Sequence, residues 1–298
     1  MLRPATYSIV ARDPETGALG VGVQSHWFSV GAAVPFVQAG VGAVATQSVP
    51  DPASGPRLLG ALAEGATAEA ALRAEIAADA GAAVRQTAVV DAGGHAAAHT
   101  GAGCIAEAGD VQRPGRSCQA NMMASAAVWP AMDAAYAAAQ GPVARRLLAA
   151  LDAAEAEGGD VRGRQSAAIV VAPASGGRWA RTVELRVEDH PEPLAELRRL
   201  LGLHEAYALA AEGDGLMAAG RHGEARERFE VAAALAPEAA ELRFWAGLAV
   251  AGSGDLERGA AIVREVVTSH PGFGALLDRL PAALEPAAPD VRAALGRG

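Results

Sequence analysis

Alternating apolar and polar positions in the first part of the chain predict a series of β-strands. Thr6–Arg12 and Leu19–Ser25 are rich in apolar and β-branched residues, and the Asp-Pro-Glu-Thr-Gly stretch between them supplies turn dihedrals, so a hairpin is expected. The same signals predict five further strands, two of them joined by a Gly-Gly turn: Val41–Gln47, Arg85–Asp91, His95–Thr100, Gln165–Ala172 and Arg181–Val187.

Helical segments separate these strands into groups. Thr67 is a suitable N-cap, and Pro142 suits the first turn of a helix. The expected helices are Gly55–Glu64, Thr67–Ala78, Met123–Ala139 and Pro142–Ala156. Groups of strands that alternate with groups of helices, joined by short hairpins, indicate an α+β fold in which helices pack on antiparallel sheets. A Rossmann fold is disfavoured because no Gly-x-Gly-x-x-Gly motif follows the first strand.

Beyond His190 the pattern is helical only. The two prolines of the Asp189–Pro193 linker end the last strand and precede a helix expected to begin near Leu194, so we predict two domains, residues 1–190 and 191–298. Small and aromatic residues of the second domain have the spacing of a tetratricopeptide unit: Gly213, Ala225, Phe229, Ala232 and Pro237. An all-α domain of tetratricopeptide-like helical hairpins is therefore expected. It acts either as a structural cap or as a docking platform for a protein or ligand.

The composition of the chain argues against several classes of function. The chain of 298 residues has a net charge of −9, and its 25 Lys and Arg residues are scattered, which argues against a nucleic-acid or membrane partner. It lacks a secretory signal pattern and any apolar stretch of about 18 residues, so we expect a soluble, cytoplasmic protein. Cys104 and Cys118 lack C-x-x-C spacing and are interpreted as free thiols, with a local bridge as the other interpretation. The histidines lack metal-ligand spacing, so neither a metal nor a cofactor is expected.

Thr6 is the first candidate for chemistry because it heads the first strand. A threonine hydroxyl needs a base, and a threonine at a free N-terminus carries one in its own α-amino group, whose pKa near 8 suits neutral pH. A rigid strand also holds the hydroxyl in a fixed position. The competing interpretation is that Thr6 is simply a β-prone residue.

Polar residues at strand ends form a second group of candidates. Gln24, Ser25 and His26 close the second strand, and His26 can orient a substrate or a water molecule. Gln47 and Ser48 end the third predicted strand, where an amide and a hydroxyl can bind a polar substrate. The alternatives are a hydrogen-bonded turn with the following aromatic residues packed beneath it, and a simple termination of the sheet.

Three further regions carry polar candidates. Asn121 supplies either an oxyanion-stabilising amide or an N-cap for the following helix. Asp13 either caps the hairpin turn or reaches back towards Thr6. Asp160, Arg162 and Gln165 belong to the polar stretch Gly-Gly-Asp-Val-Arg-Gly-Arg-Gln-Ser, which either binds a charged ligand, with an arginine on a substrate carboxylate, or forms a structural loop.

Several longer motifs resemble one known family. They are TYSIVARDPETGALGVGVQSHWFSVGAAVPFVQAGVGAVATQS, RQTAVVDAGG, HTGAGC, EGGDVRGRQSAAIVV and VELRVEDHPEPLAELRRLLGLH. Together, from Thr6 to His204, they resemble the bacterial and archaeal family called domain of unknown function 1028. The resemblance implies an N-terminal-nucleophile-hydrolase-like fold, a four-layer αββα sandwich of two antiparallel sheets between helical layers.

The N-terminus departs from that family. Members commonly begin Met-Thr-Phe-Ser, so that removal of Met exposes the threonine, whereas five residues precede Thr6 here. Cleavage between Ala5 and Thr6, an incorrect start codon or loss of the terminal-nucleophile mechanism each accounts for this difference.

Two functions are therefore expected from the sequence. The first is hydrolysis of an amide bond in a small molecule or peptide, with Thr6 as nucleophile and Asn121 or backbone donors at the oxyanion. The second is a non-catalytic ligand-binding or assembly module whose helical tail recruits a protein partner. By analogy with similar sandwiches, a homo-oligomer is also expected.

Overall fold

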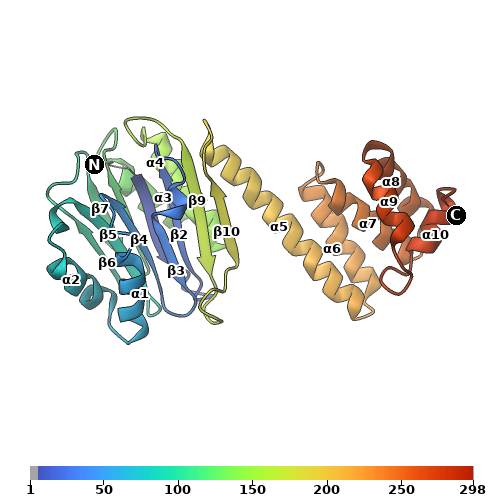
Figure 1. Cartoon of the computed structure of the whole chain (residues 1–298), viewed down its shortest axis with the longest axis horizontal. Helices are drawn as coiled ribbons and strands as arrows, with labels where there is room; N and C mark the ends of the chain where they lie inside the picture. The colour runs from blue at the N-terminus through green and yellow to red at the C-terminus, as the bar shows by residue number, and fades with distance from the viewer. Residues whose placement is uncertain (1–5, 298) are drawn as a thin grey trace. The chain divides into compact units, whose positions relative to one another are not determined.

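The computed structural model describes residues 6–297, which fold into two compact units that divide between Arg199 and Leu200. The described residues form two antiparallel sheets and ten α-helices, so the fold class is α+β with a helical C-terminal region (Figure 1). Within the described range, no helix combines the length and the apolar character needed to cross a membrane.

Both sheets of the first unit contain antiparallel neighbours only. The larger sheet has the strand order β10-β9-β2-β1-β8-β7, and the smaller one has the order β3-β4-β5-β6. The strands of the larger sheet are β1 (Thr6–Arg12), β2 (Leu19–Ser25), β7 (Gly109–Arg113), β8 (Arg116–Asn121), β9 (Ser166–Ala172) and β10 (Val183–Val187). Those of the smaller sheet are β3 (Pro35–Gln38), β4 (Gly42–Ser48), β5 (Arg85–Asp91) and β6 (Ala96–Thr100).

The predicted first hairpin is present, with the bounds expected from the sequence. Asp13 closes its turn because its carboxylate accepts the backbone N–H groups of Glu15 at 2.8 Å and Thr16 at 3.2 Å. Gly17 follows with φ +72°, a conformation that costs glycine little. In the resulting register Thr6 lies opposite Ser25, and β1 becomes a central strand between β2 and β8.

The two sheets pack face to face, and each carries a pair of helices on its other face (Figure 1). Between the sheets, valines of β1 and β2 such as Val10 and Val21 pack against Ala43, Ala45 and Val90 of the smaller sheet. Helices α1 (Ser54–Ala63) and α2 (Ala68–Ala78) cover the smaller sheet, whereas α3 (Val128–Ala138) and α4 (Val143–Ala156) cover the larger one.

Small residues let α4 approach the larger sheet closely. A Cβ atom at Gly20 would lie 2.8 Å from Leu147 Cδ1, and one at Gly22 would lie 3.3 Å from Leu147 Cβ. In the Gly-Val-Gly-Val pattern of β2, the valine side chains therefore face the core between the sheets, and the glycines face α4 with only a hydrogen atom in place of a side chain.

The sequence pattern missed strands β3, β7 and β8, and it began one helix too early. The helix expected from Met123 begins at Val128, because Met123 instead pairs with Asp160 in an isolated bridge. Asn121 ends β8, so its interpretation as an N-cap is wrong. In β8 the buried positions at every second residue are polar, so the hydropathy pattern does not indicate a strand.

The second unit is helical throughout. Its packing involves glycines, since a Cβ at Gly213 would lie 2.9 Å from the Phe229 ring and one at Gly247 would lie 2.8 Å from Val263. The helices of this region, including the one that spans the division between the units, are α5 (Pro193–Ala218), α6 (His222–Leu235), α7 (Ala240–Gly252), α8 (Leu256–Ser269), α9 (Pro271–Arg279) and α10 (Ala288–Ala294).

Gly259→Ala is expected to destabilise the helical unit by ~1–3 kcal/mol, because the added Cβ would lie 2.5 Å from backbone atoms of Gly247 and Ala251. Gly215→Ala is the matched control. That glycine lies within α5 with nothing within 4 Å of an added Cβ, so the substitution is expected to stabilise the helix by ~0.5–1 kcal/mol. Thermal unfolding followed by helical circular dichroism measures both changes, and shifts of the same sign would contradict this packing.

Candidate functional site

Thr6 is fully buried at the start of the central strand β1. It pairs with Ser25 at the end of β2 on one side and with Asn121 at the end of β8 on the other. Its hydroxyl donates to Ser25 Oγ at 3.3 Å. The antiparallel register thus brings three polar side chains from three distant chain segments to one end of the larger sheet.

The smaller sheet contributes two glutamines to this same end. Gln47 of β4 donates through Nε2 to the Thr6 carbonyl oxygen at 3.1 Å and to Gln86 Oε1 at 2.8 Å. Its Oε1 accepts the Ser8 hydroxyl at 2.7 Å. Asn121 Nδ2 donates to Gln86 Oε1 at 2.9 Å. The amides of the two sheets therefore bond directly across the interface.

These residues belong to one buried hydrogen-bonded group, which we call the inter-sheet polar cluster. Gln119 extends it, because its Nε2 donates to Ser8 Oγ at 2.6 Å and its Oε1 accepts the Ser117 hydroxyl at 3.0 Å. The members are all buried: Thr6, Ser8, Ser25, Gln47, Gln86, Ser117, Gln119 and Asn121. Hydrogen bonds fix the amide orientations, as a preorganised site requires.

Side-chain alternation explains why the cluster occupies only one end of the interface. Thr6, Ser8 and Val10 point from β1 to the same face, since residues two apart in a strand share a face. Thr6 and Ser8 meet polar residues of β4 and β8, whereas Val10 joins the apolar core with Val21 and Val23. One face of one strand thus changes from polar to apolar along its length.

A loop crosses the Thr6 end of the larger sheet. It is held at both sides of β1, because Val161 N donates to the Met122 carbonyl at 3.2 Å and Gln165 N donates to the Ser25 carbonyl at 3.2 Å. The buried Asp160 side chain anchors it by accepting the backbone N–H of His26 at 3.0 Å and the Arg162 guanidinium Nη2 at 2.9 Å. His26, Asp160 and Arg162 therefore lie together at this edge of the sheet.

Comparison with known proteins identifies the first unit. The model of a family of unknown function, DUF1028, matches residues 6–197. The chain belongs to this family. A crystal structure of a DUF1028 protein from Silicibacter pomeroyi is similar, with a TM-score of 0.60 and 35% sequence identity over 66% of this chain and 88% of that one. None of the curated proteins matches the chain. The resemblance to DUF1028 inferred from the motifs is confirmed.

The match to DUF1028 begins at Thr6 and ends within α5, so it contains all ten strands of the described residues. It therefore also contains the whole inter-sheet polar cluster and the Asp160 loop. The helices α6 to α10 lie outside the matched residues.

Asp13 does not belong to the inter-sheet polar cluster, and the expectation that it reaches back towards Thr6 is wrong. It lies at the opposite end of β1, seven residues along a strand that rises about 3.3 Å per residue, or ~23 Å away. Its carboxylate caps the hairpin turn instead.

Gln24 and Ser48 lie next to cluster members but on the other faces of their strands. Gln24 pairs with Tyr7, which faces α4, and neither the oxygen nor the nitrogen of the fully buried Gln24 amide has a hydrogen-bond partner within residues 6–297. Ser48 ends β4 with φ +71° and follows Gln47, whose side chain points between the sheets. Neither side chain shares the face that carries the Thr6 hydroxyl.

The remaining candidates, Gln165 and His26, lie at the end of the larger sheet that the Asp160 loop crosses. Gln165 Nε2 donates to Asp189 Oδ1 at 3.1 Å, so its side chain ties the loop to the segment after β10. The turn after β2 is not the packed aromatic turn considered from the sequence, because 64% of Phe28 is exposed. His26 is half-buried, and its buried Nδ1 atom has no hydrogen-bond partner in the part of the chain that the structure describes.

Sequence reasoning missed Ser8, Gln86 and Gln119 as site residues. For Ser8 a signal was available, since it is a polar residue at an inward position of the largely apolar strand β1. Gln86 and Gln119 had no such local signal, because their partners come from distant strands. Tyr7 was missed as well. Burial, followed by the adjacent Glu155 carboxylate, raises the pKa of Tyr7 well above its ordinary value, so its hydroxyl stays protonated and donates to Glu155 at 2.7 Å.

Proposed function

We propose that this protein is an amide hydrolase of the N-terminal-nucleophile type, with Thr6 as its nucleophile. The observation that carries the proposal is the position of Thr6: first residue of a central strand, with its hydroxyl 3.3 Å from Ser25 Oγ and its carbonyl held by the Gln47 amide at 3.1 Å. A nucleophile on a rigid strand among oriented amides is the preorganisation that acyl transfer needs.

The arrangement of layers supports the same proposal. Two antiparallel sheets packed face to face, with α1 and α2 outside one sheet and α3 and α4 outside the other, correspond to a four-layer αββα sandwich. We infer that it is the N-terminal-nucleophile-hydrolase fold that the sequence motifs imply. Because one fold hosts many functions, the residues around Thr6 are stronger evidence for the function than the fold is.

The reaction requires a free α-amino group on Thr6, so hydrolysis of the Ala5–Thr6 peptide bond comes first. Thr6 Oγ1 then attacks the substrate carbonyl carbon, and the Thr6 amine accepts the hydroxyl proton. The proton passes to the leaving amine as the C–N bond breaks, which leaves an ester on Thr6. A water molecule hydrolyses that ester, releasing a carboxylic acid and restoring the threonine.

Asn121 is the residue we assign to the oxyanion. One hydrogen of its amide bonds to Gln86 Oε1 at 2.9 Å, which orients the group opposite Thr6 in the sheet, and the second is the donor to the developing charge. Ser25 of the cluster and the half-buried His26 beside it are assigned to substrate contact. Arg162, oriented by Asp160, is assigned to a substrate carboxylate.

A non-catalytic binding or assembly module is the second candidate. The observation in its favour is that Thr6 is fully buried and joined to Ala5 in the sequence, so neither its hydroxyl nor an amine is accessible without processing. In this alternative the helical tail, proposed to be tetratricopeptide-like because Gly213, Phe229 and Gly247 occupy helix contacts, recruits the partner.

Intact mass and N-terminal sequencing of the protein purified from its native host distinguish these candidates. The hydrolase is expected to begin at Thr6 and to gain one β-lactone-derived acyl group on that residue, because its amine activates the hydroxyl. The matched control is Thr16→Ala, which removes an exposed turn threonine and is expected to leave labelling unchanged. A chain that retains residues 1–5 and stays unlabelled supports the binding module and contradicts the hydrolase.

A further inference from the structure

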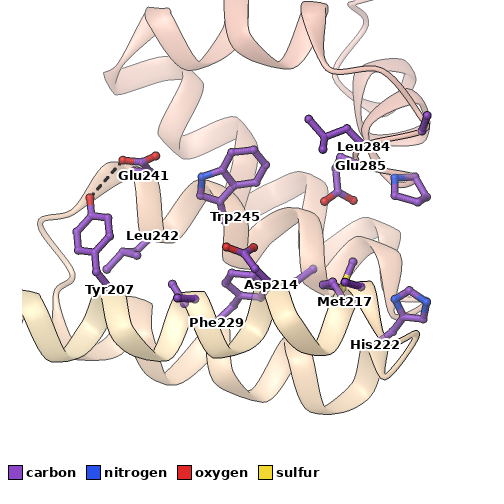
Figure 2. Close-up of a pocket in the computed structure, with 16 residues that line it drawn as sticks. Tyr207, Asp214, Met217, His222, Phe229, Glu241, Leu242, Trp245, Leu284 and Glu285 are labelled. Carbon is purple, nitrogen blue, oxygen red and sulfur yellow. Dashed lines mark hydrogen bonds between the residues drawn. The ribbon is translucent and has the colours of Figure 1, made fainter. Parts of the chain in front are cut away.

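The helical unit contains a cavity of about 750 Å³, within the range of ~300–1,000 Å³ that ligand sites occupy. Figure 2 shows its walls, which come from α5, α6, α7 and the segment 283–286. Much of the lining is apolar, with Met217, Phe229, Leu242, Trp245 and Leu284 among its side chains. This site is separate from Thr6 and its proposed chemistry.

Three carboxylates also line this cavity, and its lining contains neither Lys nor Arg. Glu241 accepts the Tyr207 hydroxyl at 3.3 Å, and the largely buried Glu285 accepts the backbone N–H of Ala287 at 3.2 Å. Within residues 6–297, Asp214 has neither a hydrogen bond nor an ion pair.

Five other acidic residues of the same unit each form an ion pair with an arginine: Glu212, Glu224, Glu230, Glu265 and Asp278. Within residues 6–297, none of the three cavity carboxylates has such an arginine partner, so the cavity carries negative charge that no Lys or Arg of its lining offsets. A positively charged ligand complements these carboxylates.

The cavity partly desolvates two of these carboxylates. Desolvation raises the pKa of Asp214, which is still exposed to solvent, and burial is the largest cause of the raised pKa of Glu285. The nearby Asp214 also raises the pKa of Glu285, whereas the hydrogen bond from Ala287 N and the nearby His222 on the cavity lining lower it. In Figure 2 the Asp214 and Glu285 carboxylates and the Trp245 indole lie around the same space. An aromatic face beside two carboxylates suits an ammonium or guanidinium group.

We propose that this cavity binds a basic side chain of a partner protein, presented by a peptide segment in which Lys or Arg is flanked by apolar residues. The basic group lies between Asp214 and Glu285 against Trp245, and the flanking residues contact the apolar walls. A peptide is assigned because the cavity is several times larger than one basic side chain, and because Tyr207 and Leu284 on its lining are exposed by 42% and 71%.

Fluorescence anisotropy with two labelled peptides tests the proposal on the full-length chain. The probe is Ala-Leu-Arg-Leu-Ala, and its reference is the same peptide with citrulline, which keeps the shape of arginine without its charge. The arginine peptide is expected to bind at least about tenfold more tightly, and its affinity is expected to fall between about 50 and about 300 mM NaCl.

Two sets of variants locate the binding. Asp214→Asn combined with Glu285→Gln is expected to weaken the arginine peptide about tenfold and to leave the citrulline peptide unchanged. Asp290→Asn is the control, since this exposed carboxylate of α10 lies outside the cavity lining. Circular dichroism verifies that each variant is folded, and Trp245→Leu, which keeps an apolar side chain, is the second test if the double variant unfolds.

Four results would overturn the assignment. Three of them are equal affinity for the two peptides, an unchanged affinity of the double variant for the arginine peptide, and failure of the arginine peptide to bind. The fourth is free agmatine that binds as tightly as the arginine peptide, because the cavity would then be a site for a small cation. None of these outcomes depends on residue 6, so the test is independent of the proposed hydrolase.

Discussion

Thr6→Ala is expected to abolish amide hydrolysis, with a loss of ~10³-fold or more in kcat/KM against a library of small amides and short peptides. The reason is that the substitution removes the atom that forms the bond to the substrate carbonyl, and removal of a nucleophile typically costs this much or more. The buried position of Thr6 makes a conformational check necessary, so thermal unfolding of the variant is measured alongside.

Thr6→Ser is the matched variant for this prediction. It keeps a hydroxyl on the same carbon and is expected to retain turnover, because serine at a free N-terminus carries the same base. Full turnover by Thr6→Ala would exclude Thr6 as nucleophile. An equal loss in both variants would show that the threonine methyl group, and with it packing, carries the effect.

Gln47→Leu is expected to lower the free energy of unfolding of the sheet unit by ~2–5 kcal/mol. The side chain is fully buried and bonds to the Thr6 and Gln119 carbonyls, to Gln86 Oε1 and to the Ser8 hydroxyl. Leucine removes all of these bonds at once, and each buried polar group left without a partner costs ~1–3 kcal/mol. The added apolar surface offsets only part of that loss.

Urea unfolding followed by hydrogen exchange of β1, β4 and β8 peptides measures this change, because that readout separates the sheet unit from the helical unit. Gln112→Leu is the control. That glutamine is exposed on β7, and within the described residues its side chain bonds only to Asp110, so the cost of losing that side chain is expected to stay within about 0.5 kcal/mol. If the two substitutions cost the same, the inter-sheet polar cluster does not hold the sheets together.

The strands that sequence reasoning recovered are those with a strong apolar pattern. β1 and β2 have many β-branched residues and a turn with clear dihedral requirements, and the structure has both with the expected bounds. By contrast, β8 contains Ser117, Gln119 and Asn121 on one face, and a polar face normally indicates solvent. These side chains are buried because they have hydrogen-bond partners inside the interface. Asn121 bonds to Gln86 of the other sheet, whereas Ser117 bonds to Gln119, which bonds to Ser8 of β1.

The residues of the candidate site also divide into those that the sequence indicated and those that it did not. Thr6, Ser25 and Gln47 stood out as polar residues at the ends of predicted strands, and Asn121 stood out as a polar residue ahead of a predicted helix. Antiparallel pairing and a glutamine from the other sheet bring them together. Asp13 stood out as well, but a strand of seven residues separates it from Thr6. Gln86 and Gln119 were missed because a mid-strand or inward glutamine has no local signature, and its role depends on a partner from a distant strand.

The sequence by itself determined the alternation of strands and helices, the first hairpin, the change to helices after His190 and the membership of DUF1028, because turn chemistry, periodicity and motifs are local properties of the chain. Only the tertiary structure decided which polar residues meet. Sheet order and register set which side chains lie opposite one another, and those depend on contacts between residues far apart in the chain, such as Thr6 with Asn121 and Gln47 with Gln86.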